Sequence, residues 1–135
     1  MSIIRNYWKS TLTLLAILYL SFTPTSEFNK LPPIKIEYLD KIVHVVLYSF
    51  FTFILVTDFS KNTRVIKNRR NYFIFSCIVF PLLFGAFVEI AQELWFYPRS
   101  AEWIDWFADI LGVSIGLIVM CLFKKIKFKP CTTKL

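Results

Sequence analysis

The chain has 135 residues, of which 56% are hydrophobic and 19% aromatic, and its formal net charge is +7 at pH 7. A soluble domain of this length could not bury so much apolar surface, so the composition excludes a soluble protein and predicts an integral membrane protein. The positive charge could suggest a nucleic-acid partner. However, the cations lie beside apolar runs, where they suit an anionic membrane surface, and we predict no nucleic-acid binding.

The fold class predicted from the apolar runs is all-α, a single domain over residues 1–135 that forms an integral membrane bundle. Four runs predict four transmembrane helices, at about 6–23, 41–59, 72–91 and 104–123. The first run is short for a span and ends at Pro24, and a cleaved secretory signal peptide is the alternative interpretation. No small-x-small cleavage site follows it. Pro81 interrupts the third run and predicts a kink there.

Basic residues are concentrated at one side of the four runs. Twelve of the sixteen cations precede the first run, lie between the second and third, or follow the fourth, and Asp58 is the only acid among them. The other two connections and their adjoining helix ends hold four cations and eight acids. Because basic residues stay on the cytoplasmic side of a membrane, this distribution predicts that both termini are cytoplasmic.

Polar residues are expected to gather at the opposite, outer end of the bundle. Acids inside or beside membrane-length apolar runs are costly, so they are functional candidates, and we expect all of them, with the single histidine, at this end. Spacings of three and four residues place Lys41, His44 and Tyr48 on one helix face, and Glu89 and Gln92 share a face in the same way, as do Asp105 and Asp109. The candidates come from three segments: Asp40, Lys41, His44 and Tyr48; Glu89 and Gln92; and Arg99, Asp105 and Asp109.

Small residues continue the acidic face of the last run. Ala108, Gly112 and Gly116 recur every four residues, and the GxxxG pattern predicts a close approach of another helix. Gly85, one turn before Glu89, would allow a similar approach. The nearby aromatic residues are expected to form an aromatic belt at the outer interface. These are Trp95, Phe96, Tyr97, Trp103 and Trp106.

Each polar candidate also has a structural interpretation. Lys41 and Arg99 could anchor helix ends at the interface, and Asp105 could cap the last helix. Glu89 is the hardest to explain in this way. It lies between Val88 and Ile90, so it needs a cationic or hydrogen-bonding partner, for which Arg99, Lys41 and His44 are the candidates.

At these positions the chain resembles the VanZ-like family of small bacterial membrane proteins, over about residues 38–118. The motifs are Asp40-Lys41-x-x-His44-x-x-x-Tyr48, Glu89-x-x-Gln92, Pro98-Arg99, Asp105, Asp109, Gly112 and Gly116. Asp109 departs from the pattern, because many relatives have asparagine there. The resemblance implies a bacterial cytoplasmic membrane and an association with reduced susceptibility to teicoplanin and related lipoglycopeptides. It implies no particular reaction.

Three functions remain open. In the first, which we favour, the outer cluster binds or masks the head group of a membrane lipid or lipid-linked cell-wall precursor, or interferes with a lipoglycopeptide. Lys41 and Arg99 would then pair with phosphate. In the second, His44 acts as acid or base, tuned by Glu89 or Asp105, in an enzyme of a lipid-linked envelope substrate. In the third, the cluster is a polar clasp that only holds the bundle together.

We expect no cofactor and assign no metal site. The three cysteines, Cys77, Cys121 and Cys131, show neither pairing nor metal-ligand spacing, and we expect no disulfide. No GxSxG, HExxH or phosphate-binding loop is present. A divalent metal held by residues of the outer cluster is an alternative that no tight ligand motif supports. Its ligands would be His44, Glu89, Asp105 and Asp109.

Overall fold

The computed structural model describes residues 6–23, 39–62, 68–95 and 103–124, and these residues form helices and no strand. The helices are α2 (Trp8–Phe22), α4 (Leu39–Asn62), α5 (Arg69–Ile74), the π-helix η1 (Phe75–Val79), α6 (Phe80–Trp95) and α7 (Trp103–Lys124). Because α5, η1 and α6 follow one another directly, they form one continuous helix. The all-α prediction is confirmed for this part of the chain.

Three of these helices are long and apolar enough to cross a membrane. Within the described ranges they are Asp40–Lys61, Arg69–Trp95 and Trp103–Phe123, whereas α2 is apolar but has only 15 residues. Large apolar side chains such as Tyr19, Leu122 and Phe123 point away from the protein interior on these helices. Apolar surface of this extent suits contact with lipid. The prediction of a membrane protein therefore agrees with both helix length and surface.

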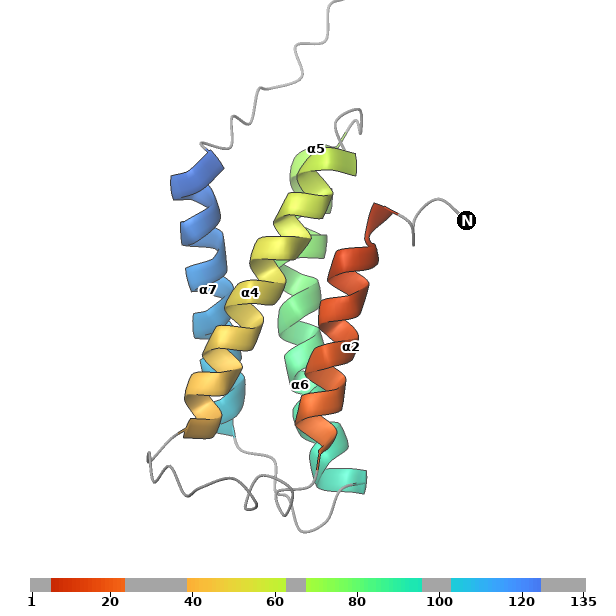
Figure 1. The fold of residues 1–135 in the computed structure, drawn as a ribbon, viewed down its shortest axis with the longest axis vertical. Coiled ribbons are helices and arrows are strands. Elements are labelled where there is room, and N and C mark those ends of the chain that lie inside the picture. The colour runs from red at the N-terminus through yellow and green to blue at the C-terminus, as the bar shows by residue number, and fades with distance from the viewer. Residues whose placement is uncertain (1–5, 24–38, 63–67, 96–102, 125–135) are drawn as a thin grey trace, which may run out of the picture.

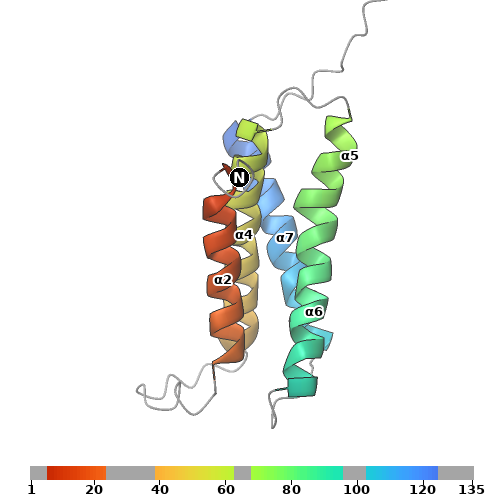
Figure 2. The same ribbon diagram turned by 90° about the vertical axis from the view of Figure 1, so that its right-hand side faces the viewer.

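The helices lie side by side and alternate in direction (Figures 1 and 2). At one end of the bundle, at the top of Figure 1, α2 begins, α4 ends, α5 begins and α7 ends. At the other end α2 ends, α4 begins, α6 ends and α7 begins. The two ends therefore correspond to the basic and the polar sides predicted from the sequence.

The contact between α4 and α7 is the most extensive in the bundle. A Cβ atom at Gly112 would lie 2.7 Å from the carbonyl oxygen of Val45, and one at Gly116 would lie 2.6 Å from the carbonyl oxygen of Ser49. Both distances are too short for a side chain, so glycine is what lets the two backbones touch. The close approach predicted from the GxxxG pattern is confirmed, and its partner is α4.

Helix boundaries differ from the predicted ones at both ends of the bundle, and the largest difference is at the outer end, where α6 continues to Trp95 and not to residue 91. α4 continues to Asn62 and the third helix starts at Arg69, so both extend into the predicted 60–71 connection. A π-helical turn, η1, ends two residues before Pro81. Pro81 has no amide hydrogen for the carbonyl of the preceding turn, and a π-helical turn is one way in which a helix absorbs such a defect.

Candidate functional site

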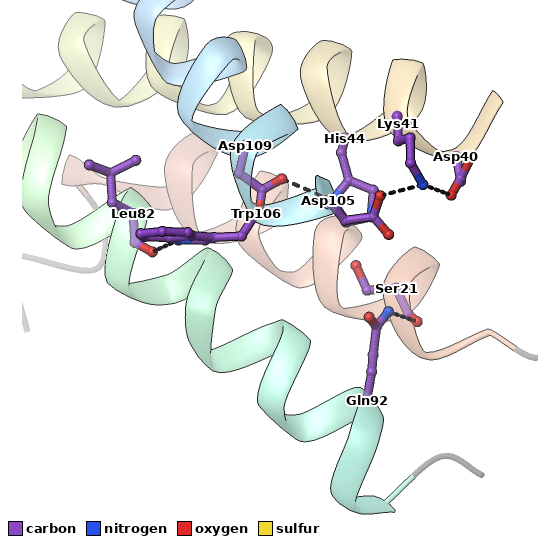
Figure 3. A network of polar contacts seen from close by, with 9 residues as sticks. All are labelled: Ser21, Asp40, Lys41, His44, Leu82, Gln92, Asp105, Trp106 and Asp109. Atoms are coloured by element: carbon purple, nitrogen blue, oxygen red, sulfur yellow. Dashed lines mark hydrogen bonds and ion pairs between the residues drawn. The ribbon is translucent and has the colours of Figure 1, made fainter. Parts of the chain in front are cut away.

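The polar candidates meet at the end of the bundle where α4 and α7 begin and α6 ends (Figure 3). His44, Glu89 and Asp109 each lie five or six residues from the nearest end of their helix. At a rise of 1.5 Å per residue, this places all three about 8–9 Å below the helix ends. Three helices therefore bring one imidazole and two carboxylates to the same depth. We call these three residues the inner layer.

The closest contact in the inner layer joins α4 to α7. His44 Nδ1 and Asp109 Oδ1 are 2.9 Å apart, and the side chain of Asp109 is 1% exposed. Tyr48, one turn further along α4, is buried and stacks on His44, with an interplanar angle of 6°. The tyrosine ring therefore supports the face of His44 from inside the bundle.

Glu89 completes the inner layer from α6. It is 5% exposed, and one ligand-type atom each from His44, Glu89 and Asp109 all lie within 4.8 Å of one another. Gly85 stands one turn away on the same helix. A Cβ atom at Gly85 would lie 2.5 Å from Asp109 Oδ2 and 3.3 Å from Tyr48 Oη. The glycine thus admits two polar side chains beside α6, whereas the sequence predicted the approach of another helix at this position.

A second set of contacts, the outer layer, lies about one turn nearer the helix ends. Lys41 Nζ is 3.0 Å from Asp105 Oδ1 on α7 and 2.9 Å from Asp40 Oδ2 on its own helix. The side chains of Lys41 and Asp105 are largely shielded, whereas Asp40 is half exposed. The Lys41 ammonium thus bridges two carboxylates. Asp105 pairs with this lysine, and the acid that contacts His44 is Asp109. The enzyme hypothesis named Glu89 or Asp105 for that contact.

Gln92 takes part in a different contact. Its side-chain nitrogen donates a hydrogen bond to the carbonyl oxygen of Ser21 on α2, at 2.8 Å. The sequence predicted Gln92 as a site residue beside Glu89, but nothing in its spacing indicated that its amide would contact α2. This contact joins α2 to α6 at the level of the site (Figure 3).

Several expectations concern residues outside the described ranges. Arg99, the predicted cationic partner of Glu89, is one of them, as are Phe96 and Tyr97 of the predicted aromatic belt. Trp95 and Trp103 are exposed, as a belt requires. Trp106 differs, because its Nε1 donates a hydrogen bond to the carbonyl oxygen of Leu82 at 3.1 Å. Trp106 therefore packs α7 against α6.

Asp58 is a buried acid that does not belong to this site. It lies near the basic end of α4 and is 4% exposed, so the expectation that all such acids gather at the outer end is wrong for this residue. The Ser10 hydroxyl and backbone N–H both donate to Asp58 Oδ2, at 2.8 and 3.3 Å. Its position in an apolar stretch was a signal. Its charge, however, balances the neighbouring cations of the basic connection, which favours an exposed position.

Chemically, the site offers more acceptors than donors. The described residues supply four carboxylates, one ammonium group and one imidazole, which suits cations, amines and hydroxyl groups, with Lys41 as the anchor for an anion. Comparison with family models, curated proteins and solved structures finds no match to the chain. The geometry of the two layers and the sequence motifs are thus the grounds for the functional proposals.

Proposed function

We propose that the protein is a four-span bundle of a bacterial cytoplasmic membrane with both termini in the cytoplasm. Basic residues flank the end where α2 begins and α7 ends, as the positive-inside rule requires for this orientation. Two polar contacts support α2 as a retained fourth span rather than a cleaved leader. They are Ser10 to Asp58 near one end of α2 and Gln92 to Ser21 near the other.

On this orientation, the two-layered cluster faces the outer leaflet and binds the polar head group of an envelope lipid or lipid-linked precursor. Binding would mask the head group and lower susceptibility to teicoplanin and related lipoglycopeptides, the role that the VanZ-like resemblance implies. The observation that carries this proposal is the stacking of the two layers. The Lys41 ammonium lies nearest the helix ends, where a phosphate would arrive, and acceptors from α6 and α7 lie beneath it.

One observation favours an enzyme as the second candidate. The 2.9 Å contact between His44 Nδ1 and Asp109 Oδ1 is the arrangement in which a carboxylate orients a catalytic imidazole and leaves its Nε2 for proton transfer. The substrate would again be a lipid-linked envelope molecule. A lipid that is chemically altered only in cells carrying the protein, detected by mass spectrometry of membrane extracts, would favour this candidate over masking.

The polar clasp is the remaining alternative, because the contacts of Lys41 with Asp105 and of His44 with Asp109 also join α4 to α7. These three functions can be distinguished in a bacterial strain that depends on this protein for protection from teicoplanin. Teicoplanin susceptibility is measured for wild type, Glu89→Gln and His44→Ala, with membrane protein level quantified in parallel and vancomycin, which lacks a lipid tail, as the control drug. Asp58→Asn is the matched variant, since it alters a buried acid at the opposite end.

We expect both outer-end variants to lose protection at normal protein level, and Asp58→Asn to retain it. Loss of protection together with loss of protein would indicate the clasp. Full protection in both outer-end variants would reject the site. No effect of the wild type on teicoplanin susceptibility would reject the link to lipoglycopeptides.

A further inference from the structure

The inner layer has the composition and spacing of a metal site. It combines one ring nitrogen with carboxylate oxygens from two other helices, all within 4.8 Å of one another. We propose that His44, Glu89 and Asp109 bind one divalent first-row cation, Zn²⁺ or Mn²⁺. This set differs from the four-residue alternative considered from the sequence, because the Asp105 carboxylate is engaged by Lys41.

The distances need little adjustment to close around an ion. Two ligand atoms about 2.1 Å from a common ion, at angles between tetrahedral and octahedral values, lie about 3.0–3.4 Å apart. His44 Nδ1 and Asp109 Oδ1 are already 2.9 Å apart. A cation would replace the proton shared by these two atoms. The Glu89 carboxylate oxygen lies within 4.8 Å of both atoms, so it has to approach them by at most about 1.4 Å to reach a spacing of about 3.4 Å. A side-chain rotation can supply this movement.

A second observation, independent of the spacing, concerns the other oxygen of Asp109. The residue is 0% exposed, and Asp109 Oδ2 makes no hydrogen bond within the described part of the chain. Tyr48 Oη lies on the same side, near Gly85, but the two atoms do not reach the geometry of a full hydrogen bond. A buried carboxylate oxygen without a partner is costly and requires an explanation, of which a bound cation is one. Gly85 provides the room beside it.

The ligand types select the class of cation. Imidazole nitrogen favours Zn²⁺ and other first-row ions, whereas Mg²⁺ and Ca²⁺ prefer sites made only of oxygen. Three protein ligands leave at least one coordination position open. That position would accept an oxygen of the head group. This last step rests on the proposed function, whereas the cation site itself does not.

The test uses the full-length protein purified in detergent, stripped with EDTA and dialysed against Mn²⁺ or Zn²⁺. We expect one ion per chain by elemental analysis, and pulsed electron paramagnetic resonance of the Mn²⁺ form should show coupling to one imidazole nitrogen. His44→Gln should remove this coupling. Glu89→Gln and Asp109→Asn should each weaken binding by more than about tenfold, since even outer-shell partners of metal ligands contribute that much.

Two control variants make the result specific. Asp58→Asn changes a buried aspartate at the opposite end and should keep both the stoichiometry and the nitrogen coupling. Cys121→Ser removes an exposed thiol that could bind Zn²⁺ and should also have no effect. Circular dichroism and gel filtration show which variants fold. If Asp109→Asn does not fold, the cation site is tested by comparing the wild type with His44→Gln and Glu89→Gln.

The absence of a one-to-one site in the wild type would overturn the proposal. So would binding without nitrogen coupling, or an equal loss of binding in Asp58→Asn. The outcome is separable from that of the proposed function. A protein that binds Mn²⁺ at this site but gives no protection from teicoplanin keeps the cation site and rejects the function. Protection by a protein without metal binding rejects only the cation site.

Discussion

The two ends of the bundle each bury one aspartate, and they do so in different ways. At the basic end, a single residue of α2 supplies two donors to Asp58, the hydroxyl and the amide of Ser10. At the outer end, Asp109 meets one imidazole and lies beside the carboxylate of Glu89, and one of its own oxygens makes no hydrogen bond in the described structure. Burial of an acid alone therefore does not identify a functional site. A buried acid on which polar residues from several helices converge is the better indication of one.

The outer end also depends on a structural feature that the basic-end aspartate does not need. Asp109 reaches His44 because α7 lies directly on the backbone of α4, and this contact runs from Gly112 to Gly116 below the site. Asp58 instead contacts α2 through the hydroxyl and the backbone N–H of Ser10. Variants that change these contacts one at a time should therefore affect stability and the outer site to different extents.

The largest effect on stability is expected from Gly116→Ala. The new Cβ would lie 2.6 Å from the Ser49 carbonyl oxygen and 2.9 Å from Thr52 Cβ, so the helices must separate. Overpacking against backbone should cost about 3 kcal/mol in the free energy of unfolding, at the upper end of the usual range. Denaturant titration in mixed micelles measures this cost. The control is Ser114→Ala, on an exposed part of α7, where a change of that size would contradict the assignment.

A smaller effect is expected from Asp58→Ala at the basic end. The variant leaves the two Ser10 donors without their buried acceptor, which should lower the free energy of unfolding by about 2 kcal/mol. Metal binding and teicoplanin protection should persist in the fraction that folds. The double variant with Ser10→Ala removes the hydroxyl partner as well and should recover part of the loss. A loss of function at normal protein level would show that the two ends are coupled.

Gly85→Ala should affect the site more than the fold. Its Cβ would meet the end of the Asp109 side chain at 2.5 Å, and a carboxylate can rotate away where a backbone cannot. We expect less than about 1 kcal/mol of lost stability, because the strain is relieved by one side chain. Affinity for Mn²⁺ should fall by about tenfold, as is usual when a ligand is displaced from its orientation. Unchanged affinity would place the ion away from Asp109.

The sequence predicted the arrangement within each helix better than the pairing between helices. The spacing of Lys41 and His44, and of Asp105 and Asp109, placed each pair on one face. The structure indeed pairs these two faces, one turn apart. Spacing along a helix does not fix the register against its neighbour. For that reason, the sequence could not tell that Asp109, and not Asp105, would meet His44.

The polar contacts of α2 with α4 and α6 could not be predicted from the sequence. Ser10 and Ser21 are small residues in an apolar run, and no spacing distinguishes them from packing residues. Their buried contacts arise because α2 lies against both α4 and α6, which is a property of the assembled bundle. Asp58, the buried acid at the basic end, is hard to predict for a related reason. Its charge matched the neighbouring cations of the 60–71 connection, which hid the fact that the side chain points inward.

The smallest effect is expected where the outer layer meets solvent. Asp40→Asn removes a charge 2.9 Å from Lys41 Nζ, but the Asp40 side chain is 52% exposed, so water replaces much of the interaction. Exposed pairs of this kind contribute little, and stability should change by no more than about 0.5 kcal/mol. Asp105→Asn should cost more, because its shielded carboxylate is the cross-helix partner of Lys41. Equal effects of the two variants would mean that Lys41 acts as a surface anchor. A larger effect of Asp105→Asn would place the lysine between α4 and α7, as a part of the site.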